Sequence, residues 1–328
     1  MTGSPVTVGV AGVGSLGYHH ARLYAGLPDA RLAGVYDIDP ARAGKVAQTV
    51  GTKAFGSLEA LLDAAEAVSV VVPTPAHHAV GMAALARGRH VLIEKPIAAS
   101  LAEAEALVAA ARRAGVVLQT GHVERFNKAV RAAMPHLKDV RYVESDRVAP
   151  FALRGSDVAV ILDLMIHDID LVLTLVGAPV TEVRASGIGV VTPNVDIASA
   201  RIEFAGGAVA NLTASRLARE RVRTLRVFQP SGYLSLDLAA GTGEFLRLKP
   251  DALRALGAHG APDLSTVVEQ VPLAASDGEP LGLELGSFLR AVRGEEPVAV
   301  SGEEGLEALR IAFRVLEAMK PAAALAPA

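Results

Sequence analysis

The chain opens with the stretch Val6-Thr-Val-Gly-Val-Ala-Gly12-Val-Gly14-Ser-Leu-Gly17. Val6, Val8 and Val10 form a short apolar run, typical of a buried parallel strand. The glycines that follow give the spacing G-x-G-x-x-G where a helix should begin. In this motif the first glycine makes a tight turn, the second lets the backbone approach a pyrophosphate, and the third lets helix and strand pack closely. The helix end would present its N–H groups to the phosphates.

A second apolar run, Arg31–Tyr36, ends in Asp37, twenty residues beyond Gly17. An acid at this place accepts hydrogen bonds from the adenosine ribose of NAD. Three glycines are often only a turn, but here strand, turn, helix, strand and acid come in order. The stretch therefore predicts a site for NAD rather than NADP, although Arg42 lies close enough to reach a 2′-phosphate. Its residues are Gly12, Gly14, Ser15, Leu16, Gly17 and Asp37.

The composition narrows the class of protein. The chain has 328 residues, enough for two domains with substantial cores, and a net charge of -3 with no basic run that would indicate nucleic acid. It has no cysteine, which excludes disulfides, thiol nucleophiles and cysteine-ligated metal. Met1–Pro5 lacks the pattern of a secretory signal, and no uncharged apolar run reaches the length of a membrane span. We expect a cytoplasmic protein.

Strands and helices alternate through the first half of the sequence. Expected helices cover 15–26, 78–87 and 100–113, and expected strands cover 68–72, 90–93 and 116–120. This alternation predicts an α/β fold, a doubly wound parallel sheet of the Rossmann type over residues 1–124. In such sheets the ligand site lies in the loops after the carboxyl ends of the strands. Five segments should therefore meet at one edge: Gly12–Gly17, Asp37, Pro73–His77, Glu94–Pro96 and Gly121–Asn127.

One further motif is specific. The run Val91-Leu-Ile-Glu-Lys-Pro96, preceded by Pro73-Thr74-x-x-His77, resembles the Gfo/Idh/MocA oxidoreductases, named for glucose–fructose oxidoreductase and inositol dehydrogenase. The resemblance covers almost the whole chain and implies an NAD(P)-dependent dehydrogenase. It places Lys95 near the nicotinamide and the reacting hydroxyl, with a cis peptide before Pro96. Without that pattern, Lys95 would be a solvated loop lysine. The other cofactor contacts that it implies are Pro73, Thr74, His77, Glu94 and His122.

The segment Asp157–Val176 is nearly all apolar, which predicts a buried helix with Asp157 as its cap and Gly177 as its stop. Asp163, His167, Asp170 and Thr174 fall on one stripe of that helix, and Asp168 lies about 100° away. Carboxylates and a histidine on a buried helix are costly unless they are satisfied, so they indicate a site or a structural network. A metal is disfavoured because no second histidine joins them.

The family pattern D-x-x-x-H-x-x-D matches Asp163, His167 and Asp170. The resemblance implies that His167 is the catalytic base and that Asp163 contacts Lys95 or substrate. A glycine pair that many relatives carry before this aspartate is absent, since Val160-Ile-Leu162 stands there. In the segment Gly121–Asn127 the resemblance implies substrate contacts by Arg125 and Asn127. The alternative for Arg125 is a structural bridge between the domains. The expected substrate site is thus Lys95, Arg125, Asn127, Asp163 and His167, with no metal.

Residues 125–328 are expected to form an α+β domain for substrate binding and assembly. From Thr181 apolar residues alternate with polar ones, which predicts a large, open, mostly antiparallel sheet. The family pairs such sheets in homodimers or homotetramers. Lys249–Asp263 is expected to be a mobile loop, and Pro321–Ala328 a frayed end. Helices are expected over 283–292 and 303–319, and they could pack on the first domain.

These observations favour a dehydrogenase that moves a hydride between nicotinamide and a secondary hydroxyl of a sugar, polyol or sugar nucleotide. The motifs around Arg125 and His167 resemble the branch of UDP-N-acetylglucosamine 3-dehydrogenases more than inositol dehydrogenases. Two alternatives remain: an NAD-dependent, redox-assisted glycosidase, and a non-catalytic NAD-sensing regulator. A regulator would not need Lys95 and His167 together.

Overall fold

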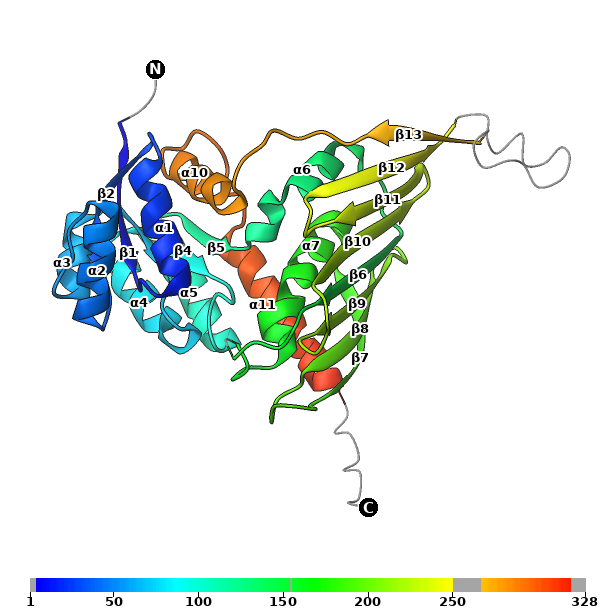
Figure 1. Cartoon of the computed structure of the whole chain (residues 1–328), viewed down its shortest axis with the longest axis horizontal. Helices are drawn as coiled ribbons and strands as arrows, with labels where there is room; N and C mark the ends of the chain where they lie inside the picture. Colours follow the sequence, from blue (N-terminus) through cyan, green and yellow to red (C-terminus); the bar gives the residue numbers. More distant parts are fainter. Residues whose placement is uncertain (1–3, 154, 250–266, 320–328) are drawn as a thin grey trace, which may run out of the picture. The chain divides into compact units, whose positions relative to one another are not determined.

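The computed structural model describes residues 4–153, 155–249 and 267–319. The chain divides into two compact units (Figure 1). The first unit runs to Val123 and takes back Gly278–Arg310; the second holds Glu124–Asp277 and the residues from Ile311 on. The late segment that the sequence left open therefore belongs largely to the first unit. The expected mobile loop, except Lys249, and the frayed end lie outside the described residues.

The first unit is built on a five-stranded parallel sheet in the order β2-β1-β3-β4-β5. This confirms the predicted doubly wound sheet. Its strands are β1 Val6–Ala11, β2 Ala30–Tyr36, β3 Ala67–Val70, β4 His90–Glu94 and β5 Leu118–Gly121. Its helices are α1 Ser15–Gly26, α2 Pro40–Val50, α3 Leu58–Ala64, α4 His77–Leu85, α5 Leu101–Ala114 and α10 Pro280–Val292, while α11 Gly302–Ala318 passes into the second unit after Arg310.

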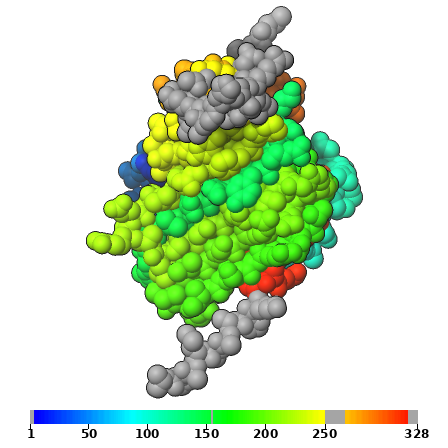
Figure 2. Space-filling model, turned by 90° about the vertical axis from the view of Figure 1, so that its right-hand side faces the viewer, coloured from blue at the N-terminus to red at the C-terminus, as the bar shows by residue number. Residues whose placement is uncertain are grey.

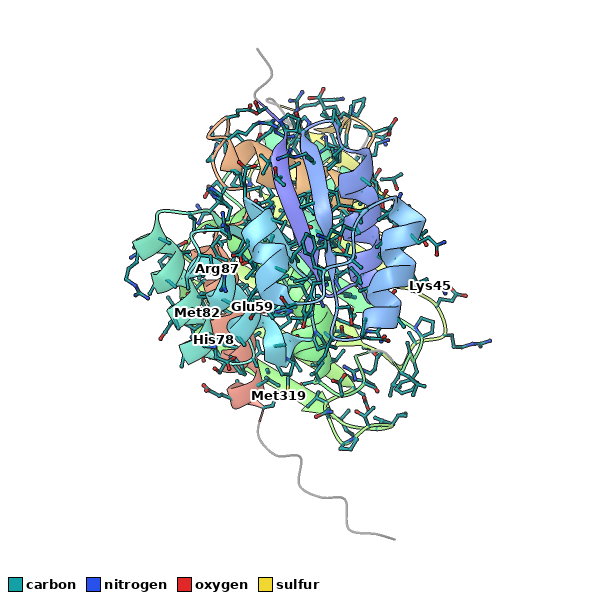
Figure 3. All side chains as sticks on the ribbon, turned by 90° about the vertical axis from the view of Figure 1, so that its left-hand side faces the viewer. Lys45, Glu59, His78, Met82, Arg87 and Met319 are labelled. Carbon is teal, nitrogen blue, oxygen red and sulfur yellow. The ribbon has the colours of Figure 1, made fainter. Side chains whose placement is uncertain are left out.

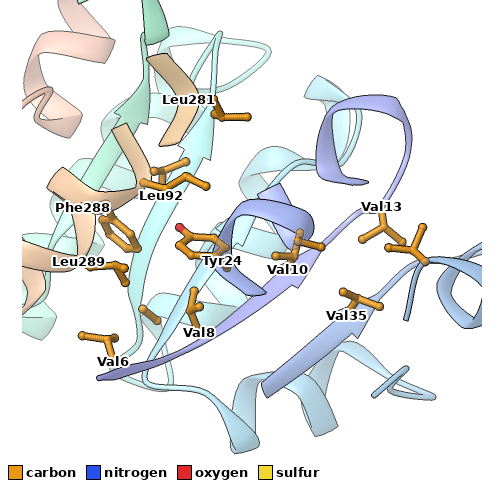
Figure 4. Packing of buried hydrophobic residues seen from close by; sticks show 14 of the residues in the cluster. Val6, Val8, Val10, Val13, Tyr24, Val35, Leu92, Leu281, Phe288 and Leu289 are labelled. Carbon is orange, nitrogen blue, oxygen red and sulfur yellow. The ribbon is translucent and has the colours of Figure 1, made fainter. Parts of the chain in front are cut away.

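The core of the first unit shows why α10 returns to it. Leu285, Phe288 and Leu289 of α10 are buried in one cluster with Tyr24 of α1 and Leu92 of β4 (Figure 4). The six residues of β1 are all buried, as a central parallel strand requires. Burial of α10's apolar face against α1 and the sheet stabilises the unit, because each fully buried large side chain contributes about 1.5–3 kcal/mol. The sequence showed an amphipathic helix but not the surface that it covers.

The second unit is built on an eight-stranded sheet in the order β13-β12-β11-β10-β6-β9-β8-β7. Only β6 and β9 are parallel neighbours, so the predicted mostly antiparallel sheet is confirmed. The strands are β6 Tyr142–Val148, β7 Val180–Ile188, β8 Ile197–Phe204, β9 Val209–Ser215, β10 Val222–Gln229, β11 Gly232–Asp237, β12 Thr242–Leu248 and β13 Val268–Pro272. Its helices among the described residues are α6 Lys128–Ala133 and α7 Ile166–Val176, with a short 3₁₀ turn at Met134–His136. Two further 3₁₀ turns cover Thr74–Ala76 in the first unit and Val123–Phe126 where the second unit begins.

One face of this sheet packs on α7, and the other is exposed. Val143, Ser145 and Arg147 of β6 are buried, while Tyr142, Glu144 and Asp146 between them are only half-buried. In Figure 2 the strands run as yellow and green bands across the surface. An aromatic row lies on this outer face, with the Phe228 ring 5.7 Å from Tyr142 and 4.7 Å from Tyr233 between ring centres.

The predicted helix over 157–176 is wrong at its start. Asp157 lies in a turn and caps nothing, and Ile161–Met165 forms a π-helical turn that leads into α7. The wider π turn changes the angle between successive residues, so Asp163 does not follow the α-helical stripe of His167 and Asp170. The expected stop is correct: Gly177 ends the helix with φ 63°, in the left-handed region that favours glycine.

Candidate functional site

The glycine turn after β1 has the shape of a dinucleotide cradle. A Cβ on Gly12 would lie 2.7 Å from the backbone of Val71 and Val72, and one on Gly17 would lie 1.9 Å from the Gly12 carbonyl oxygen. A Cβ on Gly14 would instead meet nothing within 4 Å. Gly12 and Gly17 are therefore needed for packing inside the protein, whereas Gly14 leaves the outer side of the turn open. α1 begins at Ser15 with no side-chain cap and no acid in its first turn, so its N–H groups suit a pyrophosphate.

Asp37 closes this turn from the end of β2. Its Oδ2 accepts a hydrogen bond from the Val13 N–H at 2.8 Å, inside the glycine motif. Its Oδ1 accepts from the Asp39 N–H at 2.9 Å and from Arg42 Nη1 at 3.1 Å. The sequence predicted an acid for the ribose; the structure adds that this acid holds the glycine turn and is neutralised in part by Arg42. A carboxylate here also disfavours a 2′-phosphate.

Glu94 and Lys95 stand at the end of β4, before a cis peptide to Pro96. The Glu94 carboxylate points into the unit, where Oε1 accepts a hydrogen bond from His20 Nε2 at 3.0 Å and Oε2 accepts one from the Lys95 N–H at 3.3 Å. Burial opposes ionisation of Glu94, but His20, Lys95 and His77 outweigh it and hold the pKa of this carboxyl below its usual range. Gly121 leaves room for it, since a Cβ there would lie 2.9 Å from Glu94 Oε1. This geometry favours a brace under Lys95 over a cofactor contact for Glu94.

His77 joins two of the predicted loops. Its Nδ1 lies 2.9 Å from the Pro96 carbonyl oxygen and its Nε2 lies 2.9 Å from that of Val72. Burial lowers the pKa of His77, while these two carbonyls favour the protonated ring. The imidazole therefore ties the loop after β3 to the Lys95 loop rather than facing a ligand. Pro73 and Ser15 are exposed, Thr74 and Leu16 are half-buried, and His122 is fully buried.

The first unit thus brings its predicted residues to one edge of the sheet. Gly12, Asp37, Pro73, Lys95 and His122 follow β1, β2, β3, β4 and β5 in turn, at the carboxyl ends of five parallel strands. This edge is where a doubly wound sheet binds its ligand. The residues fit NAD, because they supply a phosphate cradle, a ribose acceptor and a cation.

In the second unit a buried ion network carries α7. Arg147 on β6 makes a two-bond pair with Asp168, Nε to Oδ2 and Nη2 to Oδ1 both at 2.8 Å, and a third bond to Glu124 Oε1 at 2.7 Å. All three side chains are at least 90% buried. Burial would lower the pKa of Arg147, but Asp168 and Glu124 raise it above its usual range. Sequence reasoning set Asp168 aside and did not find Arg147.

Arg125 and Asn127 are used within the second unit. Arg125 makes a two-bond pair with Asp170, at 2.8 Å from Nε and 2.6 Å from Nη2. The Asn127 side chain accepts from the Ala129 N–H at 3.0 Å and donates to the Leu238 carbonyl at 2.8 Å and to Glu124 at 3.1 Å. Asn127 therefore caps α6, and its amide is fully engaged. The geometry favours a structural role for Asn127 over the predicted substrate contact. The pair with Asp170 ties Arg125 to α7, the histidine helix that carries His167.

Asp163 and His167 are both half-buried, in contrast to the buried Asp168 and Asp170. Asp163 lies in the π turn against Gly155, where a Cβ would stand 2.5 Å from Asp163 Oδ2. Gly155 thus leaves room for the Asp163 carboxylate. Asp163 and His167 are thus the two members of the predicted D-x-x-x-H-x-x-D motif whose side chains are partly exposed.

The described residues contain no cluster of three or more His, Asp or Glu arranged to hold a metal ion. Among those same residues, no helix is long and apolar enough to cross a membrane.

Comparison with known proteins gives the relatives. Residues 6–122 match an oxidoreductase family with an NAD-binding Rossmann fold, and residues 135–235 match the GFO/IDH/MocA C-terminal domain. The chain is 40% identical over 318 residues to UDP-N-acetylglucosamine 3-dehydrogenase of Acidithiobacillus ferrooxidans, covering 95% of this chain and 96% of that one. It is 33% identical over 231 residues to scyllo-inositol 2-dehydrogenase (NAD(+)) of Bacillus subtilis, covering 64% and 67%.

Solved structures agree. The UDP-N-acetylglucosamine 3-dehydrogenase of Acidithiobacillus ferrooxidans superposes with a TM-score of 0.86 at 38% identity, over 96% of this chain and 98% of that one. A levoglucosan dehydrogenase in complex with NADH and levoglucosan has a TM-score of 0.83 at 19% identity, over 96% and 97%, which shows a shared fold alone.

Proposed function

The chain belongs to the Gfo/Idh/MocA family of NAD-binding oxidoreductases, and from that premise we propose that it oxidises a secondary hydroxyl on the sugar of a sugar nucleotide. The observation that carries the proposal is the 40% identity to a UDP-N-acetylglucosamine 3-dehydrogenase over nearly the full length of both chains. The inositol dehydrogenases are less similar: the scyllo-inositol 2-dehydrogenase match covers 64% of this chain, and a myo-inositol 2-dehydrogenase of Thermotoga maritima matches 95% of this chain at 28% identity. The proposed substrate class follows the relative with the higher identity.

The cofactor site consists of the glycine turn, Asp37, and the loops that His77 ties together. Gly12 and Gly17 hold the turn, Gly14 leaves the approach open, and the α1 N–H groups face the phosphates. When bound, NAD supplies the hydride acceptor. Pro73, Thr74 and His122 stand on the same edge as candidate nicotinamide contacts.

We assign Lys95 and His167 to the proton chemistry. The His167 imidazole takes the hydroxyl proton as the carbon is oxidised. Histidine is suited to the role of general base because an unperturbed imidazole titrates near neutral pH. The Lys95 ammonium stabilises the developing alkoxide, an effect that is largest where water is excluded. Asp163 is the accessible acid that orients this pair, while Glu94 holds the Lys95 backbone through the hydrogen bond described above.

The test is a substrate screen that follows NADH absorbance with purified protein. UDP-N-acetylglucosamine, N-acetylglucosamine, myo-inositol and scyllo-inositol are each offered with NAD and with NADP. We expect the highest kcat/KM with UDP-N-acetylglucosamine and NAD. A higher value for either inositol would contradict the substrate class. Cleavage of a glycoside without net NADH would instead indicate the redox-assisted glycosidase.

We further propose a cytoplasmic homodimer or homotetramer that forms through the outer face of the eight-stranded sheet. That face carries the aromatic row of Tyr142, Phe228 and Tyr233 beside ion pairs such as Arg226–Glu144. Aromatic side chains surrounded by polar groups are typical of a surface through which subunits associate. Light scattering measures the mass in solution of the wild type and of Phe228→Asp. A monomer mass for both proteins would contradict the proposed assembly.

A further inference from the structure

The end of the large sheet gathers arginines on its helix-covered face. Arg216 follows the last residue of β9, and the chain returns through Arg219 and Arg221 to Arg223, the second residue of β10. The ladder sets Arg223 directly opposite Arg147 of β6. Because alternate residues of a strand share a face, Arg147 and Arg223 lie on the side of the sheet that packs on α7. Arg216, just after β9, and the exposed Arg221, just before β10, flank them. Like charges opposite each other destabilise a sheet, so this grouping needs a reason.

The carboxylates nearby do not balance the arginines. Glu124 Oε1 serves Arg147 at 2.7 Å and Arg223 Nη1 at 3.3 Å, and Asp168 is taken by Arg147. Asp196 lies 3.9 Å from Arg216 Nε and is already satisfied by three backbone N–H groups of its own loop. Four guanidinium groups therefore face three carboxylates. Burial and Arg147 lower the pKa of Arg223, with Arg221 adding to the repulsion.

Two of these arginines retain unused donors. Arg216 is only 4% exposed, yet its Nε and Nη1 have no hydrogen-bond acceptor within the described parts of the chain. Its Nη2 donates a hydrogen bond to the Val158 carbonyl oxygen at 2.8 Å. Arg221 is exposed and has no carboxylate within ion-pair distance among the described residues. By contrast Arg226, which points to the opposite face of the sheet from Arg223, is ion-paired with Glu144. Buried unsatisfied donors are costly, so they indicate a missing acceptor.

The cluster is coupled to the helix of the proposed base. Arg223 shares Glu124 with Arg147, and Arg147 holds Asp168, the residue after His167. These residues all belong to the second unit. An anion held at Arg221 and Arg223 would therefore sit on the scaffold that carries His167.

We propose that Arg221 and Arg223, supported by Arg216, bind the phosphate of a phosphorylated substrate. Guanidinium groups pair with phosphate oxygens through two parallel hydrogen bonds, and such a group supplies the acceptors and the negative charge that this face lacks. The proposal rests on the proposed function in one respect: the diphosphate of a sugar nucleotide is one source of this group. The phosphate of a simple sugar phosphate is the other.

The experiment measures binding and turnover separately in the full-length protein. Calorimetry without NAD uses UDP and glucose 6-phosphate as probes against the wild type, Arg221→Gln, Arg223→Gln and the control Arg247→Gln. Arg247 is a half-exposed arginine of the same sheet that is ion-paired with Glu269 at 2.5 Å. Arg221→Gln is the main variant, because Arg221 holds no other residue and its loss should leave the thermal melt unchanged. Arg223→Gln removes a partner of Glu124 and is interpreted only if it melts like the wild type.

We expect UDP to bind the wild type and Arg247→Gln equally and to bind Arg221→Gln about tenfold or more weakly. The KM for UDP-N-acetylglucosamine should rise by a similar factor, with kcat and the Kd for NAD unchanged. Binding of glucose 6-phosphate but not UDP, lost in Arg221→Gln, would support the site and assign it to a sugar phosphate. Absence of binding for both probes, or equal UDP binding by a folded Arg221→Gln, would overturn it.

The two proposals fail in different ways. If UDP binds through these arginines but UDP-N-acetylglucosamine is not oxidised, the proposed function fails and the phosphate site stands. If UDP-N-acetylglucosamine is oxidised and its KM is the same in Arg221→Gln and the wild type, the function stands and the phosphate site fails.

Discussion

The glycine turn of the first unit and the histidine helix of the second are held by different kinds of contact. In the turn, Gly17 packs on Gly12 and Asp37 bonds to Val13, 24 residues away. On the helix, ion pairs to arginines of other elements hold the acids: Asp168 pairs with Arg147 of β6, 21 residues upstream, and Asp170 pairs with Arg125 of a 3₁₀ turn, 45 residues upstream. Fixed spacing is thus enough to specify a cofactor cradle, whereas the placement of a base depends on tertiary partners.

The largest expected effect separates chemistry from binding across the two regions. Lys95→Ala and His167→Ala should each lower kcat by ~10²–10⁴ while the Kd for NAD stays near that of the wild type, since each removes one group from the proposed proton transfer. The two losses should not add, because both groups act on one transition state. Lys45→Ala and His78→Ala, on α2 and α4 (Figure 3), are matched controls. Near-normal turnover by His167→Ala would remove this histidine from the mechanism.

The next effect concerns the acids of the histidine helix. Asp168→Asn leaves the buried Arg147 without its two-bond partner and should cost about 3–5 kcal/mol of unfolding free energy, lowering Tm by roughly 10 °C. Asp163→Asn, at a half-buried acid, should leave Tm nearly unchanged and lower kcat. Thermal melts beside steady-state rates decide between these roles.

The structure also changes what we expect of Asp170. From the sequence, Asp170 could either orient His167 or serve as a structural partner. Because Asp170 makes a two-bond pair with Arg125, we expect Asp170→Asn to be less stable than the wild type. If Asp170→Asn melts like the wild type but turns over slowly, the pair with Arg125 serves catalysis instead.

A third prediction tests the open side of the cradle. Gly14→Ala adds a methyl group where the structure shows nothing within 4 Å, so the fold should tolerate it, whereas NAD should bind about tenfold or more weakly. Gly44→Ala, in the middle of α2 and also without a neighbour within 4 Å, is the control and should stabilise the protein by about 0.5–1 kcal/mol. Isothermal titration with NAD and urea unfolding measure both. Unchanged NAD affinity in Gly14→Ala would mean that the phosphates do not approach this residue.

Most of the first unit could be predicted from its sequence, because hydrophobic period and turn or cap residues act locally. The helix α3 and the return of α10 to this unit were not predicted. The β-branched runs, Ser15 after the glycine turn and the caps Asp39 and Ser100 each fix an element boundary within a few residues. The family motif also predicted the cis peptide before Pro96 correctly. What the sequence could not show was direction: Glu94 follows a strand where a ligand contact is expected, yet its carboxylate turns inward to His20.

The second unit was harder to read for two physical reasons. A π turn such as Ile161–Met165 has the same composition as an α-helix, so its altered period is invisible in the residues. The partner of a buried acid can come from any strand, so Arg147 carried no signal beyond being an arginine in an alternating run. Only the inward position of Arg147 in the strand pattern of β6, where an apolar residue is expected, could have indicated a buried ion pair.

The smallest expected effect tests whether long-range partners are a rule in the second unit. Asp196 is fully buried, and its Oδ2 accepts hydrogen bonds from the N–H groups of Val190, Val191 and Thr192 at 2.7–2.9 Å, while Oδ1 accepts from the Thr192 hydroxyl. Every one of these partners lies within six residues of Asp196. Burial alone would raise the pKa of Asp196, but these bonds outweigh it and hold the pKa well below its usual range.

The sign of the pH dependence follows from that direction. The unfolded chain has an ordinary carboxyl with a pKa near ~3.9. Since the folded pKa is lower, the stabilisation from Asp196 is complete above pH ~4 and is lost as the pH falls toward the folded pKa. In urea unfolding, Asp196→Asn should therefore be less stable than the wild type at pH 6, and the difference should shrink toward pH 2. His167→Ala or NAD binding should not share this trend. A difference in stability that stays constant with pH would show that the loop needs the shape of the Asp196 side chain and not its charge. The loop around Asp196 would then not be comparable to the turn that the Asp37 carboxylate holds.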